Sequence, residues 1–279
     1  MTKSHRWGCL AMAAAAVLCA GPLWAQQAPA DAAGQAAELA KKLTNPVADL
    51  ASIPFQFNWQ NGVGTNDDLR MVLNVQPVVP VSVSENWNLI GRFILPIVSQ
   101  PQLTPGGETA FGTGDIVLSA FLSPKKGGVT WGVGPVFGLP TTTNPLLGSG
   151  KWSIGPTAVV LKMQGPWTYG ALVNHLWSFA DTGDVEREDV NQSFLQPFLA
   201  YTTKQAVTFV VNSEATANWE AESGQEWTVP INLLASKLTR LGPFPLSVQG
   251  GLGVYVESPD SGPDWQLRMA FTVLLPKGK

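Results

Sequence analysis

The chain has 279 residues, and only 13 % of them are charged, about half of the share in a typical soluble domain. Both cysteines, Cys9 and Cys19, lie within the first 25 residues, so the rest of the chain can form neither a disulfide framework nor a thiolate metal site. Without Lys3 and Arg6, which lie in the same stretch, 15 basic residues stand against 20 acidic ones, and this net charge of −5 argues against nucleic acid as a partner.

Residues 1–25 are predicted to be a secretory signal peptide. Lys3 and Arg6 form its basic start, an apolar, Ala-rich run from Trp7 to Pro22 follows, and the small residue Ala25 precedes the expected cleavage site. The apolar run is too short for a membrane-spanning helix. We therefore expect the mature protein to be exported.

Residues 26–52 are predicted to be an N-terminal periplasmic helical segment. Asp31 is a candidate N-cap of an Ala-rich helix that ends near Leu43, and two lysines near its C-terminal end suit the helix dipole. Asn45-Pro46 then has the pattern of a second cap with proline at the first helical position. Two interpretations stay open: a flexible leader, or a helix folded into or under the mouth of a barrel.

From residue 53 to residue 279 the hydrophobic pattern has a period of two. Near the C-terminus, for example, Leu267 and Met269 alternate with Gln266 and Arg268. Two segments, 113–123 and 152–162, alternate poorly. The predicted strands cover 54–60, 69–83, 87–98, 113–123, 129–139, 152–162, 167–179, 192–203, 206–219, 226–238, 245–256 and 264–275. About eleven tilted residues span the apolar band of roughly 25 Å of an outer-membrane barrel.

The connections between these strands alternate without exception between a short class and a mostly longer class. The longer connections are acidic, and the short ones are mostly basic. Short periplasmic turns and long extracellular loops are typical of outer-membrane barrels. The fold predicted from these patterns is all-β: a transmembrane antiparallel up-and-down β-barrel of about twelve strands, with a short N-terminal helical segment.

Tryptophan is predicted to mark the two membrane interfaces. The nine tryptophans after the signal peptide all fall at strand ends, where an apolar ring with a polar N–H is favoured. The membrane-interface girdle is expected to contain Trp59, Trp152, Trp177, Trp219, Trp227 and Trp265 on the long-loop side, and Trp87, Trp131 and Trp167 on the short-turn side.

The prolines inside the predicted strands argue against a simple closed barrel. A proline cannot donate to a strand ladder, so inside a strand it requires a bulge or an edge. A soluble sandwich with free edges, or a lateral gap in the barrel wall, would also accommodate such residues. Six prolines lie inside predicted strands: Pro77, Pro96, Pro135, Pro156, Pro197 and Pro230.

The strand face opposite the apolar one is predicted to line a lumen that forms the path of the solute. Its charges could select solutes at a constriction, or they could neutralise one another and close the barrel. The predicted lumen residues are Arg70, Asn74, Arg92, Asn212, Glu214, Gln249 and Arg268.

Several stretches together resemble the MetA-pathway of phenol degradation family of outer-membrane transporters. They include NPVADLASIPFQFNWQNGVG (Asn45 to Gly64), WNLIGRFILPIV (Trp87 to Val98), GTGDIVLSAFLSP (Gly112 to Pro124), WGVGPVFGLPT (Trp131 to Thr141), and KWSIGPTAVVLKMQGPWTYGALVNHLWSFA (Lys151 to Ala180). The resemblance covers nearly the whole mature chain. It implies an outer-membrane β-barrel that passes small molecules, with aromatic or apolar compounds as candidates.

Catalysis is not expected, and neither are a cofactor or a metal site. Ser–His chemistry needs a base, and His175 is the sole histidine after the signal peptide. The main hypothesis is an outer-membrane channel or transporter whose partners are membrane lipid and a small-molecule solute, with its oligomeric state open. The alternatives are a structural or adhesion barrel without an open pore, a barrel-embedded lipid hydrolase that uses His175, and a soluble periplasmic β-sandwich.

Overall fold

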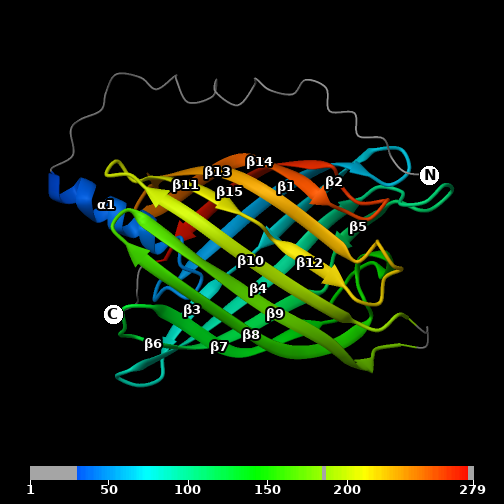
Figure 1. Cartoon of the computed structure of the whole chain (residues 1–279), viewed down its shortest axis with the longest axis horizontal. Helices are drawn as coiled ribbons and strands as arrows, with labels where there is room; N and C mark the ends of the chain where they lie inside the picture. The colour runs from blue at the N-terminus through cyan, green and yellow to red at the C-terminus, as the bar shows by residue number, and fades with distance from the viewer. Residues whose placement is uncertain (1–29, 184–186, 276–279) are drawn as a thin grey trace.

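The computed structural model describes residues 30–183 and 187–275. The predicted signal peptide lies outside these residues. Figure 1 shows a barrel of long tilted strands with one helix at one end. The elements are α1 (Ala30–Lys42), β1 (Ser52–Val63), β2 (Asp68–Val75), β3 (Val78–Ser82), β4 (Trp87–Gln100), β5 (Ala110–Thr113), β6 (Ile116–Pro124), β7 (Thr130–Leu139), η1 (Pro145–Leu147), β8 (Lys151–Gln164), β9 (Trp167–Asp181), β10 (Asn191–Thr202), β11 (Val207–Asn212), β12 (Ala215–Asn218), β13 (Trp227–Leu241), β14 (Phe244–Glu257) and β15 (Trp265–Leu274).

The strands form one antiparallel meander that closes on itself. The segments β2 and β3 continue one another between the same two neighbours, as do β11 and β12. The segments β5 and β6 both pair with β4 and continue one another along it, which gives twelve barrel strands. The first and last strands close the ring by pairing from Ser52↔Leu274 to Asn61↔Trp265. The prediction of a closed up-and-down barrel is therefore confirmed, and the sandwich alternative is wrong.

The period-two pattern sorts side chains into an inner and an outer face. On β15, Trp265 and Leu267 face outward with 42 % and 39 % of their surface exposed, whereas Gln266 and Arg268 face inward with 1 % and 3 % exposed. Large apolar side chains are exposed in the same way on strands all around the wall. A soluble monomer rarely shows so extended an apolar surface, and lipid would cover it.

Prolines and bulges are absorbed without opening the wall. The long predicted strands break at Pro77, at Gly114-Asp115 and at Ser213-Glu214. Pro96 still pairs with Asn74 on one side and accepts a hydrogen bond from the Gly114 backbone on the other. Pairing also resumes on both sides of the other in-strand prolines. Among the described strands, the lateral gap considered above is therefore absent.

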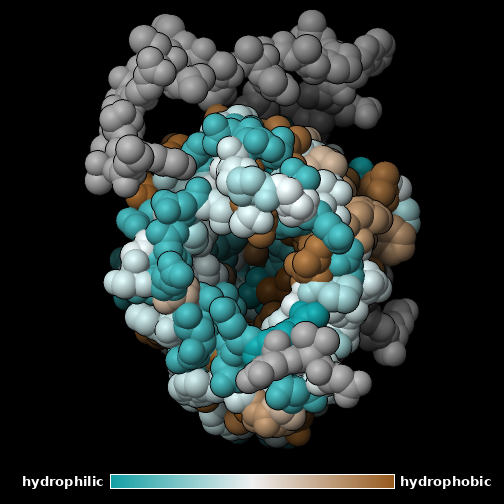
Figure 2. All heavy atoms as spheres, turned by 90° about the vertical axis from the view of Figure 1, so that its right-hand side faces the viewer, coloured by the Kyte–Doolittle hydropathy of each residue, from teal (hydrophilic) through white to brown (hydrophobic). Residues whose placement is uncertain are grey.

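The two ends of the barrel differ. The longer connections lie at the end marked by β5 and β12, and the short turns lie at the end that carries α1 (Figure 1). Viewed from the long-loop end, hydrophilic residues surround a hollow (Figure 2). No helix in the described ranges is long and apolar enough to cross a membrane.

The N-terminal segment forms a helix, as predicted, with two differences. The helix begins at Ala30, so Asp31 lies inside it rather than at its N-cap. Asn45 does not begin a second helix. Its Oδ1 atom accepts a hydrogen bond from the Val47 backbone N–H at 2.9 Å, and the chain makes a single turn before it enters β1. That turn leads the chain into the barrel mouth.

Candidate functional site: the polar lumen

A buried ion pair crosses the inside of the barrel. Arg268 on β15 donates from Nη1 and Nη2 to the two carboxylate oxygens of Glu214, at 2.8 and 2.7 Å. Glu214 lies between β11 and β12, so the pair passes over β13 and β14. A bidentate pair of this kind is rigid and strongly directional. Among the predicted lumen residues that the structure describes, Arg268 and Glu214 are the two that form an ion pair.

Glycines on β14 make room for contacts that cross this strand. Gly253 pairs with Asn232 of β13 on one side and with Gln266 of β15 on the other. Gln266 Nε2 donates to Asn232 Oδ1 at 2.6 Å across it, and a Cβ atom on Gly253 would lie only 2.2 Å from that oxygen. Any larger residue at position 253 would therefore break this bridge.

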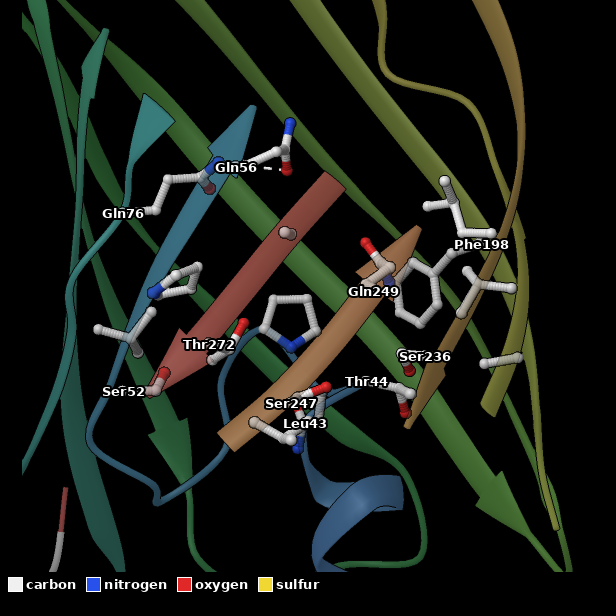
Figure 3. A pocket seen from close by; sticks show the side chains of 18 of the residues that line it. Leu43, Thr44, Ser52, Gln56, Gln76, Phe198, Ser236, Ser247, Gln249 and Thr272 are labelled. Atoms are coloured by element: carbon white, nitrogen blue, oxygen red, sulfur yellow. Dashed lines mark hydrogen bonds between the residues drawn. The ribbon is translucent and has the colours of Figure 1, made fainter. Parts of the chain in front are cut away.

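A chain of hydrogen bonds extends the ion pair along the inner wall. Arg268 Nε donates to Asn58 Oδ1 at 2.8 Å, which also accepts from Gln56 at 3.4 Å. Gln76 then donates to Gln56 at 3.4 Å (Figure 3). Arg92 donates to Gln76 at 2.9 Å. This belt runs from β15 through β1 to β4, so Arg92 and Arg268 lie on one connected polar surface.

A second branch contains two more of the predicted residues, Arg70 and Asn212. Arg70 Nε donates to Gln60 at 2.7 Å, and Gln60 donates to the Tyr255 hydroxyl at 2.7 Å. Asn232 donates to Asn212 at 3.0 Å. The partners of Arg70 and Arg92 in these hydrogen bonds are neutral amides, so both guanidinium groups keep their charge toward the lumen.

The predicted lumen residues do not all line one space. Arg92, Asn212, Glu214, Gln249 and Arg268 surround a cavity of about 230 Å³ on the α1 side. Arg70 lines a separate space of about 470 Å³ on the long-loop side. Asn74 shares the inner face with Gln56, its pairing partner, but lines neither cavity. The polar belt thus lies between an outer vestibule and an inner chamber.

The N-terminal segment forms one wall of the inner chamber. Leu43 and Thr44 lie close to Ser236 and Ser247 of the barrel wall (Figure 3). Val47, which is only 4 % exposed, packs with Ile90, Phe121 and Leu172 on the inner face. The segment therefore narrows the lumen from the short-turn end, with an apolar anchor and a polar surface toward the chamber.

The girdle tryptophans lie on the outer surface near the strand ends. Trp152, Trp177, Trp219, Trp227, Trp265, Trp131 and Trp167 are exposed, and Trp59 and Trp87 are half-buried. Two pairs pack edge to face, Trp87 with Trp131 on the short-turn side and Trp219 with Trp227 on the long-loop side. That the two levels lie at the two membrane interfaces stays a prediction.

An ion-pair cluster ties two long connections together at the outer end. Lys151 Nζ lies 2.5 Å from an oxygen of Asp181 and 3.2 Å from one of Asp189. The hydrogen bond from Lys151, helped by one from Ser178, lowers the pKa of Asp189 below its ordinary value. The cluster therefore stabilises the fold above the ordinary aspartate pKa, and this contribution is lost as the pH falls through the lowered one.

Replacing Lys151 with Met is expected to lower the thermal unfolding midpoint at neutral pH. The effect should shrink as the pH falls through about 3.9 and below, where Asp189 becomes protonated in both proteins. Thermal unfolding in detergent, at neutral pH and again below the lowered pKa of Asp189, measures the change in the midpoint. Lys204→Met, in a short turn, is the control and should behave as the wild type does. An equal loss for Lys151→Met at both pH values would contradict the assignment.

Known proteins are similar in fold only. No family model matches the chain, and no curated protein matches it. Among solved structures, an outer membrane channel from Pseudomonas putida F1 superposes with a TM-score of 0.61 at 18 % identity, covering 81 % of this chain and 96 % of that one. The porin NanC superposes with a TM-score of 0.53 at 8 % identity, covering 80 % and 99 %. Outer membrane phospholipase A from Escherichia coli reaches 0.46 at 13 % identity, covering 88 % and 98 %. The chain thus shares the closed-barrel fold of outer-membrane proteins.

Proposed function

We propose that this protein is an outer-membrane channel for small molecules, lodged in lipid by its apolar outer face and its tryptophan girdle. The observation that carries the proposal is the polar lumen, in which charged and amide side chains lie between an outer vestibule and an inner chamber. The channels of similar fold support the same class of function.

The expected solutes are small, and their charge decides how fast they pass through the barrel. Arg92 and Arg268 lie with Glu214 around the inner chamber, and Arg70 lies with Asp115 around the outer vestibule, so arginines outnumber carboxylates along the path. Such a lining attracts anions and repels cations. The resemblance to the phenol-degradation family adds aromatic or apolar compounds to the candidate solutes. Small aromatic carboxylates are both aromatic and anionic, so they fit both expectations.

The remaining parts of the chain fit this proposal. Residues 1–25 would direct export, and residues 26–52 would lie on the periplasmic side, where α1 and the turn at Asn45 narrow the lumen. The acidic long connections would face the cell exterior, as is usual for outer-membrane barrels. No cofactor is required for passive passage.

Liposome swelling with matched aromatic solutes tests the proposal. Benzoate, benzyl alcohol and benzylammonium have similar size and differ in charge. Benzoate should enter fastest and benzylammonium slowest. Arg92→Gln should narrow that difference, because it removes a charge from the inner chamber but keeps a polar group there. Lys126→Gln, in a short turn outside the lumen, is the matched control. Folded protein that admits none of the three solutes would favour the structural or adhesion barrel instead.

A further inference from the structure

A polar cluster lies on the outer face of the wall, at the long-loop end of β9, β10 and β12, which run side by side (Figure 1). His175 Nδ1 lies 2.8 Å from Ser193 Oγ, and His175 Nε2 lies 3.1 Å from Asn191 Oδ1. Trp219 Nε1 donates to Ser193 Oγ at 2.9 Å. Asn191 Nδ2 donates to Glu220 Oε1 at 3.0 Å. None of these side chains lines the lumen cavities.

The carboxylate end of this chain fixes the direction of its hydrogen bonds as far as Nε2 of His175. The indole N–H of Trp219 can only donate, and a carboxylate such as Glu220 only accepts. Asn191 must therefore turn its carbonyl oxygen to the histidine, which donates to it from Nε2. In the neutral form of His175 that donates from Nε2, Nδ1 is unprotonated and accepts the proton of Ser193. In that form the cluster is a hydroxyl bonded to an imidazole base, which is itself oriented by an amide.

The position of the cluster suits an ester at a membrane surface. Trp177 and Trp219 are about half exposed beside it, and such rings prefer the membrane interface. Further along the same two strands, Val173 and Leu195 pair with each other and are both exposed. An acyl chain could lie along this apolar track while its ester group reaches Ser193 at the level of the tryptophans.

We propose that Ser193, His175 and Asn191 form a lipid-facing hydrolase site that cleaves acyl esters of membrane lipids. A nucleophile, a base within hydrogen-bond reach and a third group that orients the base are the parts that acyl transfer requires. The site is on the opposite side of the wall from the lumen, so it does not depend on solute passage.

The reaction balances with water as the second substrate. Ser193 Oγ attacks the ester carbonyl carbon, and its proton moves to His175 Nδ1. The bond between the carbonyl carbon and the alcohol oxygen then breaks, and the alcohol leaves with that proton. Water attacks the acyl-serine, His175 takes a proton from the water, and Ser193 regains it as the fatty acid leaves.

The other members have defined roles in this site. Asn191 and Glu220 are positioning residues that hold the Nε2–H tautomer of His175. The Trp219 N–H donates to the reacting oxygen of Ser193, so in the proposed reaction it is the donor nearest to the ester oxygen on which negative charge would develop.

Fatty-acid release from diacyl phospholipid in mixed micelles tests the proposal with the refolded full chain. The wild type should release fatty acid, and an alkyl fluorophosphonate should label Ser193. Ser193→Ala and His175→Ala should each lower kcat by about 10³-fold or more. Benzoate entry into liposomes should stay unchanged in Ser193→Ala, which separates this site from the proposed channel.

A serine outside the cluster provides the control. Ser213 follows β11, its side chain is buried, and its Oγ atom has no hydrogen-bond partner among the described residues. Ser213→Ala should keep full hydrolysis. The proposal is overturned if the heat-modifiable, folded wild type releases no fatty acid and takes no label, or if Ser193→Ala hydrolyses as fast as Ser213→Ala.

The roles of Asn191 and Trp219 are tested by measuring kcat and KM separately, because a loss of packing alone would not lower kcat at constant KM. Asn191→Leu and Trp219→Phe keep the approximate size of each side chain but remove its hydrogen bonds. Each should lower kcat and leave KM nearly unchanged, because the acyl chain still binds along the apolar track. A rise in KM at constant kcat would assign these residues to lipid binding instead.

Discussion

Deleting residues 30–50 is expected to raise the single-channel conductance severalfold. This deletion removes α1 and the turn that together narrow the inner chamber, and it leaves β1, which begins at Ser52, in place. The current should also become less selective, because the segment brings solutes close to the arginines. Planar-bilayer recordings of the wild type and the deletion measure both quantities.

A point substitution separates the plug from general loss of structure. Val47→Asp places a carboxylate among Ile90, Phe121 and Leu172, where an isolated charge costs several kcal/mol, so the segment should leave the lumen. Its conductance should approach that of the deletion. Glu38→Ala, on an exposed position of α1, should record as the wild type does. Equal conductance in the wild type, the deletion and both point variants would show that the N-terminal segment does not restrict the path of the solute.

Breaking the ion pair that crosses the lumen is expected to have the largest effect on stability. Glu214→Ala leaves Arg268, which is only 3 % exposed, without its carboxylate. Losing one member of a buried pair typically costs about 3–5 kcal/mol. Urea unfolding in detergent, followed by heat-modifiable gel mobility, measures the change.

The double variant distinguishes the lost partner from lost packing. Glu214→Leu together with Arg268→Met removes both charges, so its stability should lie closer to the wild type than either single variant does. If the losses of unfolding free energy in the two single variants add up to the loss in the double variant, Glu214 and Arg268 are not directly coupled. Glu214→Ala should also strengthen the preference for benzoate, because the inner chamber then holds no carboxylate opposite Arg92 and Arg268.

The inner and outer faces of most strands could be predicted from the sequence alone. Alternation on the last strand placed Gln266 and Arg268 inside and Leu267 outside, as the structure has them. Alternation assigns a face to each residue, but it does not say how far strands lie apart across a ring. The pairing of Arg268 with Glu214 over two intervening strands was therefore beyond its reach, and so were the roles of Asn58 and Asn232.

The two segments that alternate poorly have a physical explanation. The inner positions of β6 and β8 carry Phe121, Val159 and Leu161, which pack with Val47 of the N-terminal segment. Both faces of these strands are therefore apolar over part of their length, and the period of two fades there. The weak alternation thus marked where an inserted segment docks.

The outer polar cluster was only partly visible in the sequence. His175 stood out as the sole remaining histidine, whereas Ser193 and Asn191 lay at the uncertain start of a strand. The hairpin register that places Ser193 opposite His175 was needed to connect them. A serine and an asparagine two residues apart after a long loop are too common to signal a site by themselves.

The most direct test of the channel uses a single cysteine at the inner chamber. The chain beyond residue 25 has no cysteine, so Arg92→Cys provides one reactive position in residues 26–279. The account predicts that a bulky, negatively charged thiol reagent blocks the single-channel current of this variant and leaves the wild type unaffected. An unchanged current in the fully modified variant would contradict the claim that solutes pass through the lumen at Arg92.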